Sequence, residues 1–402
     1  MIEFAAVAAS LSSDLQAWRS ATAGPPLDKH ASQIDGVVGQ LSAALAIVDP
    51  ADSDRAVQQV LDYHHIWEFF RTKLSLRYIP WYRSFLSAAD DLAWAAWRPI
   101  RDAARTGGGI ELREPPLVYF SRQAVPFAVP RGEDYQDLLP RGGIYTTEAE
   151  QVAAALVVPV ISLPWHRSAW LPVCLSVAHE VGHVVVTDLD LGRWLIDRLA
   201  GADLPEARRP AWQAWREEVW ADIFAAVVCG STTSISLLDQ LADDDVEPAA
   251  PPWGDYPPVS VRARLIEEVA GRRGGAPPGP ATDGFEADAA AVVAALLGED
   301  LPSVGKVESC FASVDNTAMR DDAYRLTRQR NPHASDIRVL LTAATLAFST
   351  GSADERGAIQ QATLDHADEI RDVARRGREG MAANAVERDR RAGLRLAGLL
   401  TR

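Results

Sequence analysis

The spacing of apolar residues predicts a mainly helical chain. Apolar positions recur every three or four residues through four long stretches near the start, at roughly 1–20, 30–49, 53–78 and 81–106. Clusters of proline and glycine separate these stretches. Five of the twelve tryptophans lie here, and large rings at helical spacing usually fill the core of a bundle. We therefore expect an N-terminal helical bundle; a peptide-binding groove is the alternative use of these rings.

Short β-rich runs follow these helices and predict a small sheet. They lie at 117–120, 124–129 and 156–163, and prolines and glycines interrupt them. Helical spacing then returns at about 168–187, 190–200, 210–229, 232–243 and 259–271, and again through 285–402. The pattern predicts a mainly α fold with a small β-sheet (α+β). We expect helical units at 1–110 and 285–402, a central domain at 111–271, and a Gly- and Pro-rich linker at 272–284.

Composition and charge narrow the range of partners. The 402 residues, 48% of them apolar, suffice for more than one core. The chain has 40 Lys and Arg against 55 Asp and Glu, and the resulting charge of −15 repels a phosphate backbone, so no nucleic-acid partner is expected. Three cysteines without a CxxC pair provide neither a disulfide framework nor a thiolate zinc cage. Without a signal peptide or a membrane-spanning run, the expectation is a cytoplasmic protein with no membrane partner.

The clearest chemical signal is the pair His179 and His183, which encloses Glu180 in the pattern His-Glu-x-x-His. On a helix, positions i and i+4 share one face about 6 Å apart, so both imidazoles can reach one zinc ion at about 2.0–2.1 Å. Glu180 is rotated by about 100° from His179, which places its carboxylate beside the open coordination position as a candidate base. The alternative is an exposed helix that carries two histidines by chance.

A catalytic zinc site normally takes three protein ligands, so a third side chain is needed. Glu218 and Asp222 lie one turn apart on a later helix, and we expect Glu218 to bind zinc while Asp222 orients a ligating imidazole. Glu217 cannot share that face and should be solvated or paired with a cation. One alternative is a solvated acidic helix face. Another is a third ligand from Asp188 or Asp190, which we expect instead at a solvated helix end.

These residues resemble the gluzincin group of zinc metallopeptidases. In that group His-Glu-x-x-His on one helix is completed by a Glu on a later helix, often as Glu-x-x-x-Asp; here the two elements are His179–His183 and Glu218–Asp222, with 34 residues between them. Tyr256–Arg262 is similar to a His-Pro-x4-Arg element of some gluzincins, with Tyr256 in place of the histidine. The resemblance covers roughly 155–270 and implies a zincin-like central domain flanked by helical regions.

The resemblance implies a zinc-dependent peptidase, in the first place an endopeptidase. Zinc held by His179, His183 and Glu218 would carry a water that Glu180 activates for attack on a peptide bond. Candidate donors to the developing oxyanion are Tyr256, Arg262 and His166. The expected partners are a protein or peptide substrate and a regulatory protein that binds the helical flanks. The alternative function is a non-proteolytic helical scaffold or sensor that retains a zinc site.

Two further segments have both a functional and a structural interpretation. The run 156–163 resembles the edge strand with which gluzincins hold extended peptides, and a buried strand is the alternative. The region Arg371–Arg395 holds eight arginines against four acidic residues. It predicts a basic face on a terminal helix, which is either solvated or a docking surface for an acidic partner.

Overall fold

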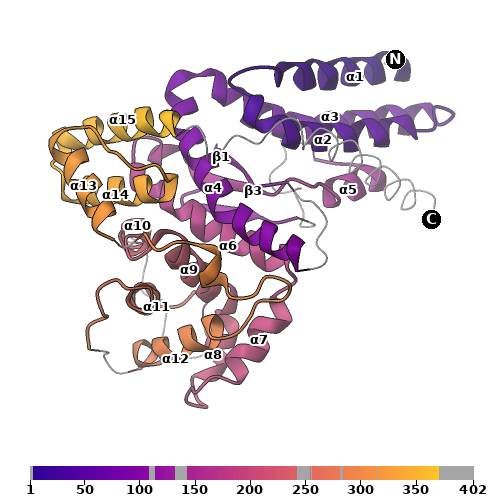
Figure 1. The fold of residues 1–402 in the computed structure, drawn as a ribbon. Coiled ribbons are helices and arrows are strands. Elements are labelled where there is room, and N and C mark those ends of the chain that lie inside the picture. Colours follow the sequence, from indigo (N-terminus) through magenta and orange to yellow (C-terminus); the bar gives the residue numbers. More distant parts are fainter. Residues whose placement is uncertain are drawn as a thin grey trace.

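The protein is mainly helical, with one small sheet (Figure 1). The computed structural model describes residues 3–107, 114–131, 143–241, 254, 256–280, 284–314 and 316–370. The α-helices are α1 (Phe4–Ala21), α2 (Ala31–Ala46), α3 (Ser53–Ser75), α4 (Pro80–Thr106), α5 (Thr147–Ala154), α6 (Ser176–Asp188), α7 (Gly192–Ala200), α8 (Arg209–Ala214), α9 (Arg216–Cys229), α10 (Thr233–Leu241), α11 (Val259–Arg272), α12 (Phe285–Leu297), α13 (Thr317–Arg328), α14 (Ile337–Thr350) and α15 (Ala353–Glu369). The strands are β1 (Leu117–Ser121), β2 (Phe127–Val129) and β3 (Val160–Pro164), and short 3₁₀ helices are η1 (Asp28–His30), η2 (Leu76–Tyr78), η4 (Trp165–Arg167), η5 (Leu171–Leu175) and η6 (Val307–Cys310). The predicted α+β class is confirmed.

Several expected boundaries differ from the structure. The helix expected from about 168 begins as α6 at Ser176, after the turns η4 and η5. The helix expected over 210–229 is two helices, α8 and α9, which meet at Trp215. Helix α5 was not expected, although Thr146 precedes it in an extended conformation and two acidic residues occupy its first turn, as is typical of a helix start.

The sheet has the strand order β1-β3-β2. Strand β3 pairs in parallel with β1, Leu117 opposite Val160, and antiparallel with β2, Val129 opposite Val160. Strand β3 is therefore central, and the expectation that it is the peptide-binding edge strand is wrong. Both of its edges are already paired, and the continuous apolar run is that of a buried strand. Strand β2 is at an edge of this sheet.

The sheet lies between two layers of helices. From β1, Leu117 and Tyr119 join a core with α1, α2, α3 and α5, whereas Val118 and Phe120 point to the other face and join the core that contains α4, α6 and α9. Side chains of a strand alternate between its two faces, so one strand contributes to both cores. Helix α4 thus packs with the helices that carry the predicted metal ligands.

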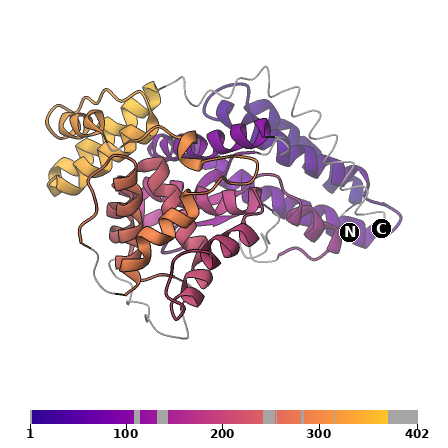
Figure 2. The ribbon, with the colours of Figure 1, turned by 60° about the horizontal axis from the view of Figure 1, so that its bottom comes forward.

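The C-terminal helices belong to this second core. Arg338 of α14 donates to the carbonyl oxygens of Val228 and Ala312, and Thr342 donates to the carbonyl of Cys229. Val228 and Cys229 end α9, so α14 satisfies carbonyls that a helix end leaves without a partner. Figure 2 shows the orange and yellow C-terminal helices at one side and the indigo N-terminal helices at the other.

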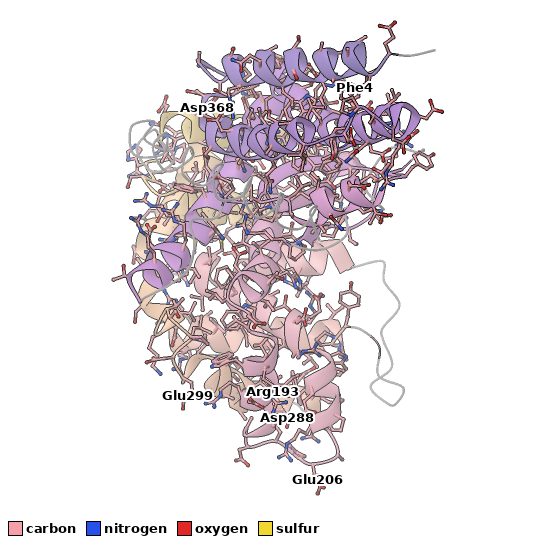
Figure 3. All side chains as sticks on the ribbon, turned by 90° about the vertical axis from the view of Figure 1, so that its right-hand side faces the viewer. Phe4, Arg193, Glu206, Asp288, Glu299 and Asp368 are labelled. Carbon is pink, nitrogen blue, oxygen red and sulfur yellow. The ribbon has the colours of Figure 1, made fainter. Side chains whose placement is uncertain are left out.

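The domain boundaries expected at 110, 271 and 284 stay predictions. The basic segment Arg371–Arg395 and part of the expected linker lie outside the described residues. Figure 3 shows Phe4 at one end of the molecule and Arg193 and Glu206 at the other. No helix in the described ranges combines the length and the apolar character that a membrane crossing requires.

Candidate metal centre

Helices α6 and α9 approach each other closely where Gly182 of α6 faces Ala221 of α9. A Cβ added to Gly182 would lie 2.9 Å from the Cα of Ala221 and 3.4 Å from the Cβ of Phe224. The first distance is shorter than any ordinary carbon–carbon contact. The glycine inside the His-Glu-x-x-His segment is thus what allows α9 to approach closely enough for Glu218 to reach the two histidines.

The three predicted ligands come together at this crossing. The Nε2 atoms of His179 and His183 are 3.2 Å apart; Oε2 of Glu218 lies 3.4 Å from the first, and Oε1 of Glu218 lies 3.4 Å from the second. Three ligand atoms around a tetrahedral zinc ion at about 2.0–2.1 Å are separated by about 3.3 Å. The residues therefore fit a zinc ion. Among the described residues, no other group of three His, Cys, Asp or Glu side chains brings its ligand atoms this close together.

Asp222 and Arg262 fix the orientation of the His179 ring. Asp222 Oδ1 lies 2.9 Å from Nδ1 of His179, so Nδ1 carries the proton and Nε2 is left to face the ligand position. Arg262 donates to both oxygens of Asp222, at 2.7 and 2.9 Å, and its Nη2 is 3.4 Å from Glu218. Asp222 and Arg262 are both buried, so solvent screens this pair little and it holds one geometry.

The side chains at the centre together attract a cation. Burial alone would lower the pKa of His179, but its contacts with Asp222 and Glu218 raise that pKa to about 10. Burial would likewise raise the pKa of Glu218, but the two imidazoles hold it well below its usual range. The arrangement stabilises positive charge between Glu218 and Asp222, supplied either by a proton or by a metal ion.

Glu180 lies beside the ligands without joining them. Only 5% of the residue is exposed, and it lines the same cavity as His179 and His183. Burial raises the pKa of Glu180, and the neighbouring imidazoles lower it in part. A buried carboxylate with a raised pKa suits a group that must both accept and release a proton.

The centre opens into a cavity of about 680 Å³. Tyr256 and Arg262, two of the expected oxyanion donors, line it, and the Arg262 guanidinium lies 6.0 Å from the centre of the Tyr256 ring. Arg262 is largely engaged with Asp222, which leaves Tyr256 as the better candidate donor. His166, the third expected donor, is exposed and is not among the described residues that line the cavity.

The alternative third ligands lie elsewhere. Asp188 ends α6 and accepts hydrogen bonds from Arg131, at 2.7 and 3.1 Å, and from Trp97, at 3.0 Å. The expectation that Asp188 is solvated is therefore wrong. A negative charge is unfavourable at a helix C-terminus, and the ion pair with Arg131 offsets this cost. Asp190 is exposed.

Sequence reasoning missed two features of the cavity. One wall is formed by strand β2 and its neighbours, including Val125, Pro126 and Pro130. The second feature is Glu217, which lines the cavity although it is turned away from the metal centre. Its adjacency to Glu218 was the available signal, since a residue next to a ligand on a helix start lies at the rim of the site.

Comparisons with known proteins identify no relative of this chain: no protein-family model, no curated protein and no solved structure matches it. The resemblance to gluzincins rests on the two sequence motifs and stays a prediction.

Proposed function

We propose that the protein is a zinc-dependent peptidase whose ion is held by His179, His183 and Glu218. The observation that carries the proposal is the convergence of the three side chains beside the buried carboxylate of Glu180. The two imidazole Nε2 atoms are 3.2 Å apart, and each lies 3.4 Å from one of the two carboxylate oxygens of Glu218. Zinc, when bound there, would supply a water of lowered pKa and polarise a peptide carbonyl. A site that only stabilises the fold has no need of a base beside its ligands.

The side chains of the chain itself perform the proton transfers. Glu180 takes a proton from the attacking water and passes it to the departing amine, so one carboxylate serves as base and then as acid. Tyr256 is the candidate donor to the developing oxyanion. Asp222 keeps His179 in the tautomer that directs Nε2 at the ion, and Arg262 holds Asp222 in place.

An extended peptide has a place to bind along strand β2. This strand is an edge of the sheet, and residues of β2 and its flanks line the cavity. Pro126 and Pro130 lack backbone N–H groups, so within 126–130 a peptide can receive hydrogen bonds only from those of the three intervening residues whose N–H groups point away from β3. A short edge of this kind holds a few peptide residues in register and resists pairing with another sheet.

The test is hydrolysis of a peptide library by zinc-loaded protein. Wild type should cleave, and Glu180→Gln should retain zinc and lose nearly all turnover, because an amide cannot accept the proton of the water. Glu206→Gln, an exposed position at one end of the molecule and not among the described residues that line the cavity, is the matched control and should cleave at the wild-type rate. Equal cleavage by wild type and Glu180→Gln would refute the assignment of the base. A cytoplasmic location and a regulatory partner for the helical flanks stay predictions.

A further inference from the structure

One charged side chain of the cavity lining lies outside the metal centre. In the described residues, five side chains of the lining have a carboxylate or a guanidinium. Glu218, Asp222 and Arg262 contact one another or the histidines, and Glu180 is buried beside the histidines. Glu217 is the fifth; its side chain is 47% exposed. It is turned away from the ligands because adjacent helical residues diverge by about 100°.

Glu217 forms an exposed ion pair with Arg216. Arg216 Nη2 lies 3.1 Å from Glu217 Oε1, and the same guanidinium donates to the carbonyl of Gln213. Both charged groups are partly exposed, and solvent screens a pair of this kind. Arg216 is also not among the described residues that line the cavity. A cationic side chain bound in the cleft can therefore compete with Arg216 for the carboxylate of Glu217.

Two of the side chains that line the cavity are large, mainly apolar and exposed. Val125, on the β2 side, is 43% exposed, and Tyr256, before α11, is 49% exposed; both line the cavity. Exposed apolar side chains at the mouth of a cavity are available for contact with a ligand. The lining thus combines one exposed carboxylate with exposed apolar side chains, on a protein whose net charge of −15 attracts cations over a longer range.

We propose that the cleft selects peptides that carry lysine or arginine within one or two residues of the scissile bond, flanked by apolar residues, and that Glu217 is the specificity-determining residue. The proposal rests on the proposed function in that a peptide is taken to occupy the cleft. Glu217 and the ligand Glu218 are consecutive, so their Cα atoms are about 3.8 Å apart, close to the spacing of consecutive peptide residues. A basic side chain near the scissile bond can therefore reach Glu217 and form a charge-assisted hydrogen bond.

The experiment compares peptides that are identical except for one position. Twelve-residue peptides with an apolar background carry Lys, norleucine or Glu at each position in turn, and kcat/KM is measured with the zinc-loaded full-length protein. Wild type should prefer Lys to Glu by about two- to fivefold at one position, the effect of one partly exposed ion pair. Glu217→Gln should bring that ratio close to one, and Glu217→Lys should invert it.

A matched control separates a local from a general effect of charge. Asp197 has the same side-chain exposure as Glu217, 47%, pairs with Arg193, and is not among the described residues that line the cavity. Asp197→Asn should leave the Lys-to-Glu ratio at the wild-type value. A wild-type enzyme without charge preference, or a preference that Glu217→Gln leaves intact, would overturn the inference while the proposed function stands.

The two proposals fail in distinguishable ways. If zinc-loaded wild type cleaves no peptide, the proposed function fails, and binding of the same fluorescently labelled peptides is measured instead. A preference for Lys in binding that Glu217→Gln removes would then support the inference on its own. Binding without charge preference, or no binding, would overturn it.

Discussion

The close crossing of α6 and α9 makes Gly182→Ala an informative perturbation. The added Cβ would lie 2.9 Å from the Cα of Ala221, whereas carbon atoms in contact are normally about 3.5–4.0 Å apart. The two helices must therefore separate by about 0.6–1 Å. The same shift would lengthen the 3.4 Å distances that join Glu218 to His179 and His183, and a zinc site tolerates only about 0.2 Å in its ligand distances.

Two opposing terms set the size of the effect on stability. Overpacking lowers the free energy of unfolding by about 1–3 kcal/mol, and the higher helix propensity of alanine relative to glycine raises it by about 0.8–1 kcal/mol. Gly182→Ala should thus lower the free energy of unfolding by about 0–2 kcal/mol and weaken zinc binding by about tenfold or more. Gly357→Ala in α15 is the control: nothing lies within 4 Å of its added Cβ, so it should stabilise the protein by up to about 1 kcal/mol.

Urea denaturation and zinc titration against a competing chelator measure both quantities. The reasoning is refuted if Gly182→Ala is stabilised as much as Gly357→Ala and also binds zinc as tightly as wild type. That result would mean that the helices can separate without disturbing the ligands.

Two further predictions concern buried carboxylates. Asp222→Ala should weaken zinc binding by about 10- to 100-fold in the same titration, because His179 loses the acceptor that orients it. Glu217→Ala should leave zinc affinity unchanged. A loss of zinc in Glu217→Ala and not in Asp222→Ala would contradict the assignment of Glu218 and Asp222 to the helix face that points at the histidines. Burial alone would raise the pKa of Asp90, but Arg77 holds it well below its usual range, so its stabilisation is complete above about pH 4 and is lost as the pH falls further. Asp90→Asn, which leaves Arg77 buried without its counter-ion, should lower the free energy of unfolding by about 3–5 kcal/mol at pH 7 and by less at pH 3 in urea denaturation; an equal loss at both pH values would contradict this.

The local part of the site could be predicted from the sequence. The spacing of His179 and His183 places both on one helical face whatever the tertiary structure, so their proximity follows from the helix alone. The convergence of Glu218 with them required a second inference, that a later helix would cross the first at small residues. Gly182 and Ala221 provide that crossing.

The tertiary part could not be predicted in the same way. A fully buried strand reads as a continuous apolar run whether it is central or at an edge, so the sequence of β3 does not reveal that β1 and β2 pair on both of its sides. The exact roles of Arg262 and Arg131 depend on carboxylates 40 and 57 residues away along the chain. No local pattern connects such residues.

The central claim is that His179, His183 and Glu218 hold one zinc ion, and the zinc content of purified protein tests it most directly. After dialysis without chelator, elemental analysis by mass spectrometry should find about one zinc per chain in wild type. His183→Ala should lose it, whereas His333→Ala, an exposed histidine outside the cluster, should keep it. Wild type that is folded and free of zinc after reconstitution, or His183→Ala that binds zinc as wild type does, would contradict the account.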